Sequence, residues 1–334
     1  MTASSLRGEL AEGFVKGADV SWLPQMEAAG FKFYDRQGNP KDCLEILKDY
    51  GINTIRLRIW VNPPGGHSGC DEVVAMAKRV HQLGMRILID FHYSDSWADP
   101  MKQNKPAAWA NDDIYQLTQD IRHHTIAVLK VLIAHGVVPE WVQVGNEISN
   151  GMLWPEGRVD KESKNLSAFL EAGYEAVKSV DPKIKVIVHL NDGSNHQLYR
   201  RFFDVLAKNR VQYDVIGLSY YPYWQKGRPD FTTTIDELGA NLADLAAQYH
   251  KEVMVVETGG EEIQPQNTAA MIAALIRKTR EVPDGKGLGV IYWEPEGAAG
   301  WSRYKLSCWQ SNGEPTAAMD GFLEGAKMKA ASAN

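Results

Sequence analysis

The 334-residue sequence lacks several features that would define other classes of protein. It has only three cysteines, Cys43, Cys70 and Cys308, so at most one disulfide could form and a disulfide framework is excluded. No Cys/His spacing indicates a zinc site. No run of eighteen apolar residues occurs, so we expect no membrane span. The first ten residues (MTASSLRGEL) also lack the apolar segment of a secretory signal.

The sequence also lacks a long basic run. Its net charge is −6 and its pI is about 5.9, so neither nucleic acid nor an anionic membrane is expected as a partner. Hydrophobic residues make up 44% and charged residues 23%, proportions that suit a globular core. Aromatic residues, by contrast, are abundant, with ten Trp and thirteen Tyr. Flat aromatic faces stack well on sugar rings, although such residues also fill ordinary cores.

One structural unit recurs along the chain, and no linker or low-complexity segment divides it. The unit is a short β-branched run, a loop and a helical pattern. The expected strands cover residues 14–20, 54–60, 86–92, 141–144, 185–190, 215–220, 253–256 and 289–293. The expected helices cover residues 42–50, 71–83, 114–135, 165–180, 197–208, 234–250 and 267–280.

Eight strands that alternate with helices predict a closed (β/α)8 barrel, the TIM barrel of the α/β class. We expect one catalytic domain over residues 1–334, with its core at about 14–325. An open, doubly wound sheet is the alternative, but it would usually show a Gly-rich nucleotide loop after a strand. GGHSG at residues 65–69 does not have that pattern.

Two glutamates stand directly after buried strand-like runs: Glu147 ends WVQVGNE and Glu257 ends VMVVE. They belong to the fourth and seventh expected strands, and barrel active sites lie at the carboxyl ends of the strands. A bare carboxylate there is costly unless it has partners or takes part in chemistry. Two facing carboxylates suit cleavage of a glycosidic bond, with a gap of about 5–5.5 Å for retention and about 6.5–9.5 Å for inversion. The alternative is that one glutamate merely pairs with Arg56 or Arg58.

Other polar and aromatic residues are expected at the same end of the barrel. Arg56 and Arg58 lie two apart on one strand and share a face, and an inward arginine would lower the pKa of a nucleophilic carboxyl. The remaining candidates could contact a sugar or the nucleophile: His92, Asn146, Tyr220 and Trp293. Each also has an ordinary structural explanation, as an ion-pair member, a satisfied histidine, a turn residue or a core aromatic.

Longer segments resemble one family of retaining barrel hydrolases. The most specific is DFHYSDSWADP at residues 90–100, and the similarity covers about residues 14–310. These segments are similar to the endo-β-1,4-galactanases, glycoside hydrolase family 53. The resemblance implies a retaining hydrolase of β-1,4-galactan, the side chains of type I arabinogalactan in pectin, that works through a covalent glycosyl-enzyme.

The resemblance also implies roles for the matching residues. Glu147 would be the general acid/base, Glu257 the nucleophile, and Asn146 the neighbour that touches the 2-hydroxyl of the sugar. Trp97 would belong to the substrate groove. The subsite of the reacting sugar would be lined by Arg56, His92, Tyr220 and Trp293.

One departure from the family concerns metal binding. Some bacterial members carry a calcium-binding loop after the seventh strand, whereas residues 259–270 (GGEEIQPQNTAA) are short and lack that ligand pattern. We therefore expect no metal and no cofactor. We expect a monomer that acts on β-1,4-galactan or galacto-oligosaccharides, and a secreted or cell-envelope precursor whose leader is absent from this chain. Two alternatives stay open: a β-1,4-glycanase acting on mannan or glucan, and a carbohydrate-binding barrel without catalysis.

Overall fold

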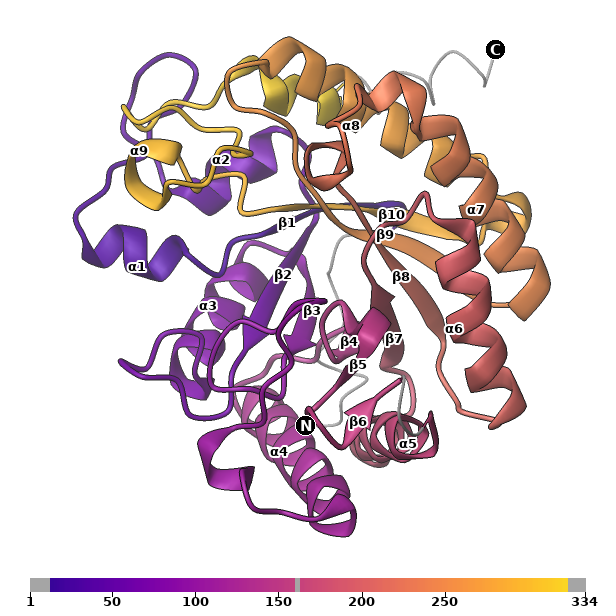
Figure 1. The fold of residues 1–334 in the computed structure, drawn as a ribbon. Helices are drawn as coiled ribbons and strands as arrows, with labels where there is room; N and C mark the ends of the chain where they lie inside the picture. Colours follow the sequence, from indigo (N-terminus) through magenta and orange to yellow (C-terminus); the bar gives the residue numbers. More distant parts are fainter. Residues whose placement is uncertain (1–12, 160–162, 324–334) are drawn as a thin grey trace.

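A closed parallel barrel forms the centre of the computed structural model, which describes residues 13–159 and 163–323 (Figure 1). Its eight strands follow the order β1-β10-β9-β8-β7-β4-β3-β2. They are β1 Val15–Asp19, β2 Thr54–Ile59, β3 Arg86–Phe91, β4 Trp141–Val144, β7 Lys185–Leu190, β8 Val215–Tyr220, β9 Glu252–Thr258 and β10 Gly287–Trp293. The expected (β/α)8 barrel is confirmed. Residues 1–12, 160–162 and 324–334 of the expected domain lie outside the described residues.

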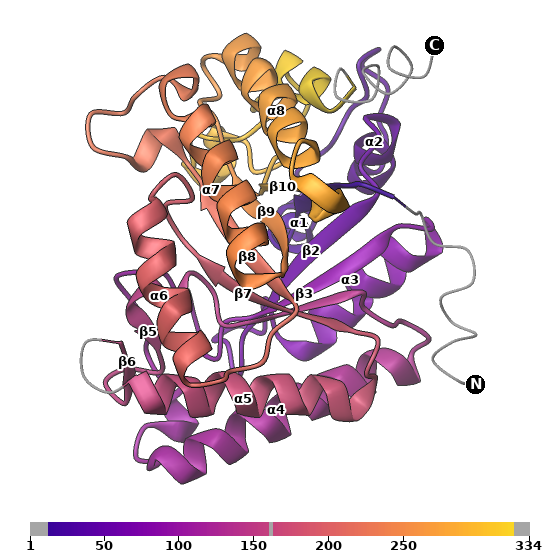
Figure 2. The same ribbon diagram turned by 90° about the vertical axis from the view of Figure 1, so that its right-hand side faces the viewer.

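Helices connect successive strands and cover the outside of the barrel (Figures 1 and 2). They are α1 Leu23–Ala28, α2 Cys43–Asp49, α3 Cys70–Gln82, α4 Ile114–Ala134, α5 Ser163–Val180, α6 His196–Lys208, α7 Ile235–Tyr249, α8 Pro265–Arg280 and α9 Ala299–Ser302. All seven expected helices are present, with ends that differ by no more than two residues. Their apolar stripes face the barrel and form the larger of two buried clusters.

The ends of α4 show how local sequence sets a helix. Asp113 accepts a hydrogen bond from the backbone N–H of Gln116, and the Gln116 side chain accepts one from the backbone N–H of Asp113, both at 2.9 Å. This capping box satisfies donors that the first turn leaves free. Beyond the other end, Gly136 has φ +83°, a conformation that glycine adopts without a Cβ penalty. The chain can therefore turn there and enter β4.

Several small elements lengthen the loops and were not expected from the sequence. A two-stranded antiparallel ribbon, β5 Gly151–Met152 and β6 Gly157–Arg158, lies between β4 and α5. Single 3-10 turns occur at η2 Ala107–Trp109, η3 Ile148–Asn150, η4 Pro222–Trp224, η5 Phe231–Thr233, η6 Pro283–Gly285 and η7 Ala317–Met319. Elements of two to four residues are too short to show a periodic pattern.

The inside of the barrel changes from apolar to polar along its axis. A compact apolar cluster fills the interior, formed by Val15, Leu88, Trp141, Ile187, Val215, Met254, Val256 and Ile291. Toward the carboxyl ends of the strands the inward positions become polar, although they remain buried: Asp19, Arg56, Arg58, Asp90, Gln143 and His189. Buried polar groups need partners. These polar side chains interact with one another in a network at the mouth of the barrel.

Candidate active site

Glu147 reaches the barrel mouth through an irregular turn after β4. Gly145 has φ +82°, and a Cβ there would lie 2.7 Å from the Ile148 side chain. Glu147 itself has φ +47°, an uncommon left-handed conformation for a non-glycine residue. Its backbone N–H donates to Nδ1 of His189 at 3.3 Å. The turn therefore lifts Asn146 and Glu147 out of the strand and presents both at the cleft.

Glu257 reaches the same mouth because β9 is irregular. Met254 and Val256 both belong to the interior cluster, so strict alternation would turn Glu257 outward. The pairing of β8 with β9 shifts between Leu218 and Ser219, and the inward Ser219 pairs with Glu257. A bulge of this kind re-aims a side chain. It gives Glu257 an inward direction at the end of its strand.

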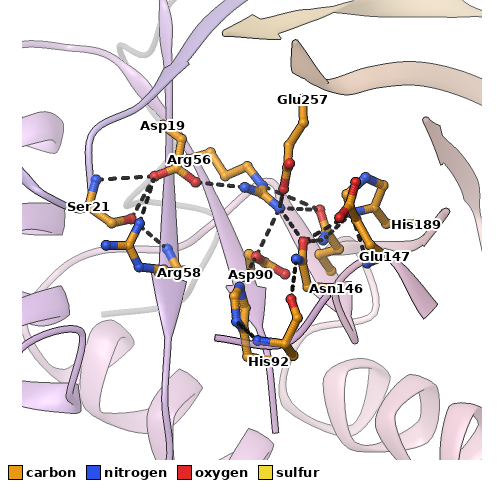
Figure 3. A network of polar contacts seen from close by, with 12 residues as sticks. Asp19, Ser21, Arg56, Arg58, Asp90, His92, Asn146, Glu147, His189 and Glu257 are labelled. Atoms are coloured by element: carbon orange, nitrogen blue, oxygen red, sulfur yellow. Dashed lines mark hydrogen bonds and ion pairs between the residues drawn. The ribbon is translucent and has the colours of Figure 1, made fainter. Parts of the chain in front are cut away.

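Arg56 is the centre of the polar network (Figure 3). Its guanidinium donates to Asp19 Oδ2 at 2.7 Å and to Asp90 Oδ2 at 2.8 Å, and it forms an ion pair with Glu257 Oε1 at 2.8 Å. It also donates to Asn146 Oδ1 at 2.9 Å. Burial alone would lower the pKa of Arg56, but the surrounding carboxylates raise it. Arg56 therefore stays charged and links residues from β1, β3, β4 and β9.

The two glutamates have different surroundings. Burial raises the pKa of Glu147 to about 7, although a hydrogen bond from Ser219 and the charge of Arg56 partly oppose this. Burial also raises the pKa of Glu257, and Arg56 opposes it. The charge of Glu147 also raises the pKa of Glu257, and carboxyls that interact in this way titrate as a pair. Within residues 13–159 and 163–323, Glu257 is the member of the pair that forms an ion pair with a cation, Arg56. When the two carboxyls share one proton, this contact favours the proton on Glu147.

A short hydrogen-bond chain leads into Glu147 from β7 and β8. His189 Nδ1 accepts from the backbone N–H of Glu147 and lies 2.9 Å from the amide nitrogen of Gln143. Its Nε2 lies 2.7 Å from the Ser219 hydroxyl, which donates to Glu147 Oε1 at 2.6 Å. Burial and the charge of Arg56 hold the pKa of His189 well below its usual value. The neutral ring therefore donates through Nε2, and the serine proton points to Glu147.

An aromatic wall lies at the mouth, formed by rings that follow β1, β3 and β10. Trp22 is its centre, with ring-centroid distances of 4.9 Å to Trp293, 6.1 Å to Trp97, 6.0 Å to Trp301 and 5.9 Å to Tyr304. Beneath it, the Arg58 guanidinium lies 4.2 Å from the Trp97 ring and pairs with Glu294. The partly exposed rings of this wall can meet the apolar face of a sugar.

The structure brings most of the expected site residues together. Trp97, Trp293, Glu147 and Glu257 line one cleft of about 990 Å³, which Asn146 and His92 also line. The polar atoms of these last two are already used within the protein. Asn146 binds Arg56 and the carbonyl of Ala98. The ring of His92 accepts two N–H donors at Nδ1 and faces Asp90 through Nε2 at 3.0 Å.

Tyr220 corrects the sequence-based expectation. It was expected to line the cleft and bond the nucleophile, but its hydroxyl donates to the carbonyl of Phe231 at 3.1 Å and lies 2.8 Å from Thr234 Oγ1. Side chains alternate along β8, and because Ser219 points inward, Tyr220 points outward. The next residue, Tyr221, donates to Glu257 Oε2 at 3.2 Å.

Sequence reasoning also missed several members of the site. Ser219 is one residue before the tyrosine that was chosen, and alternation from the strand end would have indicated it. Two partners of Arg56, Asp90 and Gln143, and the aromatic neighbours Trp22 and Tyr304 come from distant parts of the chain. No local pattern predicts which residues meet across the barrel.

Among the described residues, no group of three or more His, Cys, Asp or Glu side chains is arranged to hold a metal ion. The three cysteines are free thiols. Within residues 13–159 and 163–323, no helix has the length and apolar character needed to cross a bilayer.

The barrel, the paired carboxyls at its mouth and the aromatic wall define a glycoside hydrolase. The family model of glycosyl hydrolase family 53 matches residues 15–324, and the chain belongs to that family. A Niallia circulans protein named "Uncharacterized protein in bgaB 5′region" is 40% identical over 85% of this chain and 84% of its own length. An Aspergillus terreus protein named "Probable arabinogalactan endo-beta-1,4-galactanase A" is 35% identical over 84% of this chain and 85% of its own. The solved "Ignisphaera aggregans GH53 catalytic domain" superposes with a TM-score of 0.86 at 32% identity, covering 95% of this chain and 98% of that one.

Proposed function

We propose that this protein is an endo-acting hydrolase of β-1,4-galactan that retains the anomeric configuration. The observation that carries the proposal is the asymmetry of the two carboxyls in one cleft. Glu257 contacts the Arg56 cation and the Tyr221 hydroxyl, whereas the carboxyl of Glu147 accepts a hydrogen bond from the neutral Ser219 hydroxyl. The first arrangement suits an ionised nucleophile and the second suits a proton donor.

The reaction has two steps in this proposal. In the first, a carboxylate oxygen of Glu257 attacks the anomeric carbon, the bond to the leaving sugar breaks, and Glu147 gives its proton to the departing oxygen. In the second, Glu147 takes a proton from water, the water oxygen attacks the anomeric carbon, and the ester bond to Glu257 breaks. Both glutamates return to their starting states. The remaining proposed binding residues are Arg56, His92, Trp97, Asn146, Tyr221 and Trp293.

Galactan is proposed as the substrate because of the family and because the Aspergillus terreus relative is named as a probable galactanase. Mannan and glucan are cleaved by the same chemistry, so a substrate screen is part of the test. We further propose that residues 14–325 act as one catalytic domain, because a single closed barrel carries the whole cleft, and that the enzyme works as a monomer. A secreted or cell-envelope location is proposed because a polymeric substrate lies outside the cell.

Azide rescue of two variants tests the roles of the carboxyls. In Glu257→Ala, azide can occupy the space of the lost carboxylate and attack directly, giving an α-galactosyl azide. In Glu147→Ala, azide can attack the glycosyl-enzyme formed from an aryl galactoside, giving the β-azide. The anomer formed in each variant, read by NMR, therefore identifies the nucleophile and the acid/base. Glu175→Ala is the matched control, because that carboxylate pairs with Arg122 on the surface.

Three results would contradict the proposal. Full activity of Glu257→Ala would remove it as nucleophile. An equal loss in Glu147→Ala on aryl substrates and on galactan would remove Glu147 as proton donor, because a good leaving group needs no proton. Release of reducing ends from mannan or glucan but not from galactan would contradict the substrate.

A further inference from the structure

Two carboxyls that the proposed mechanism does not use lie in the turn after β10. Glu294 follows Trp293 directly, Glu296 comes two residues later, and both side chains are fully buried. A buried carboxyl needs hydrogen-bond partners or a cation, because burial removes the water that would otherwise solvate it. The two glutamates differ in the partners that they have.

Glu294 has a partner for each of its oxygens. Oε1 forms an ion pair with the Arg58 guanidinium, and Oε2 accepts a hydrogen bond from the backbone N–H of Trp22 at 3.1 Å. Both partners belong to the aromatic wall or support it, since Trp22 is its centre and Arg58 lies against the Trp97 ring. Glu294 therefore joins the turn after β10 to the wall.

Glu296 lacks partners of this kind. Among the residues that the structure describes, neither of its oxygens accepts a hydrogen bond from an N–H group or an alcohol hydroxyl. Arg58, the cation of this cluster, pairs with Glu294 instead. The electrostatic neighbours of Glu296 are the carboxyls of Glu294 and Asp19 and the thiols of Cys43 and Cys308. An ionised Glu296 would be an uncompensated buried charge, and a carboxyl in that position takes up a proton instead.

The contact between the two carboxyls indicates which one carries a proton. Glu294 and Glu296 are hydrogen-bonded to each other, and two carboxyls can form such a bond only when one of them has a hydrogen to donate. Both oxygens of Glu294 already accept from Trp22 and Arg58, so the hydrogen belongs to Glu296. Burial raises the pKa of both carboxyls. The charge of Glu294 raises the pKa of Glu296 further, whereas the charge of Arg58 opposes the rise at Glu294.

The turn that carries the two glutamates packs directly against the wall. The backbone N–H of Gly297 donates to the carbonyl of Glu294 at 3.1 Å, and that of Cys308 donates to the carbonyl of Pro295 at 2.7 Å. The Trp22 ring lies so close to Gly297 that a Cβ there would come within 2.8 Å of it. A shift of this turn would therefore displace Trp22.

We propose that Glu296 is a positioning residue that remains a neutral carboxylic acid in the folded protein and donates its hydrogen to Glu294, which in turn holds Arg58 and Trp22 at the aromatic wall. Glu296 does not line the cleft, so it acts on the substrate through the wall. Its effect on sugar binding rests on the proposed function, which assigns Trp97 and Trp293 to the substrate. Its protonation does not rest on that function.

Infrared spectroscopy of Glu296→Gln tests the protonation without any substrate, because a carboxylic acid and a carboxylate absorb in separate regions of the spectrum. At about pH 6.5, roughly two units above the usual pKa of a glutamate, an exposed carboxyl is ionised. The difference between wild type and Glu296→Gln should contain the band of a carboxylic acid. Glu175→Gln is the matched control and should remove a carboxylate band, because Glu175 pairs with Arg122 on the surface. Loss of a carboxylate band in Glu296→Gln would overturn the proposal.

Two variants at the same position test the positioning role. Glu296→Met has a similar size but no donor, so Glu294 loses a hydrogen bond, and KM for galactan should rise about three- to tenfold with a smaller effect on kcat. The near-UV circular dichroism of the tryptophans should change as well, while an unchanged far-UV spectrum shows that the variant is folded. Glu296→Gln keeps an N–H donor and should restore the wild-type KM and near-UV spectrum.

Wild-type KM and near-UV spectrum in Glu296→Met would overturn the positioning role. So would a Glu296→Gln protein in which both are changed as much as in Glu296→Met, and this second result decides the question even if the methionine variant does not fold. Failure of the wild-type enzyme to cleave galactan would contradict the proposed function instead. The infrared and near-UV measurements need no substrate and would still support or overturn the role of Glu296.

Discussion

Removal of the Ser219 hydroxyl should move the pH profile of the enzyme to higher pH. In the native protein this hydroxyl donates to Glu147 Oε1 at 2.6 Å, and because His189 occupies its acceptor side, the proton has one direction to point. The bond stabilises the carboxylate more than the neutral acid, so it lowers the pKa of Glu147, which burial has raised to about 7. Ser219→Ala should therefore raise that pKa further.

The size of the shift follows from the strength of the bond. A hydrogen bond to a charged group contributes about 1.5–3 kcal/mol, and about 1.4 kcal/mol corresponds to one pKa unit. Because the neutral acid also keeps part of the interaction in the native enzyme, we expect a shift of about one unit.

The alkaline limb of kcat/KM against pH measures this shift, since activity on the alkaline side falls as the proton donor ionises. Ser149→Ala is the matched control: it removes another buried hydroxyl two residues from Glu147, one that bonds Asn191. An alkaline limb that stays in place or moves to lower pH in Ser219→Ala would refute the reasoning. So would an equal shift in the control.

Three further variants and one control, Tyr220→Phe, test other parts of the site. Tyr221→Phe removes a hydrogen bond to the nucleophile and should lower kcat/KM about tenfold, while Tyr220→Phe should not change it; the reverse order would restore the sequence-based assignment. Glu147→Gln should inactivate the enzyme on galactan but raise Tm by a few degrees at pH 8 and not at pH 4. The native state binds the Glu147 proton more tightly than the unfolded chain does, so this carboxyl destabilises the fold increasingly as pH rises from about 4.5 to about 7. A gain in Tm that did not depend on pH would contradict the raised pKa of Glu147. Arg58→Lys removes the planar cation under Trp97 and should raise KM severalfold with a smaller effect on kcat; a change confined to kcat would count against a role in holding the aromatic wall.

The barrel could be predicted from sequence because most strands are short runs rich in apolar and β-branched residues. The runs at residues 141–144, 185–190 and 215–220 match β4, β7 and β8 at both ends. Strands buried on both faces need such runs, and the helices between them need an apolar stripe. The ribbon β5–β6 has no such signal, because its strands have two residues each.

The site was predictable in part, and the two residues at the ends of β8 and β9 show why. Both were selected because they end a strand. Glu257 reaches the cleft because the ladder shifts by one residue before it, whereas Tyr220 obeys strict alternation and points away. The residue at which a strand ends can be predicted from the sequence, but a bulge depends on how two strands pair and cannot. Position at a strand end thus indicates the right layer of the barrel without giving the direction of the side chain.

Because Arg56 pairs with several buried carboxylates at once, its own variants cannot test the mechanism cleanly. Its guanidinium contacts Asp19, Asp90 and Glu257, and all four side chains are buried. Removal of one member of a buried ion network leaves the others uncompensated and costs about 3–5 kcal/mol of stability. An Arg56 variant would therefore lose activity through lost charge at the nucleophile, through misplaced aspartates or through unfolding, and one measurement would not separate these causes. The Ser219 and Tyr221 hydroxyls each bond one of the two glutamates and are not members of the Arg56 ion network, so their variants perturb one glutamate while leaving that network intact.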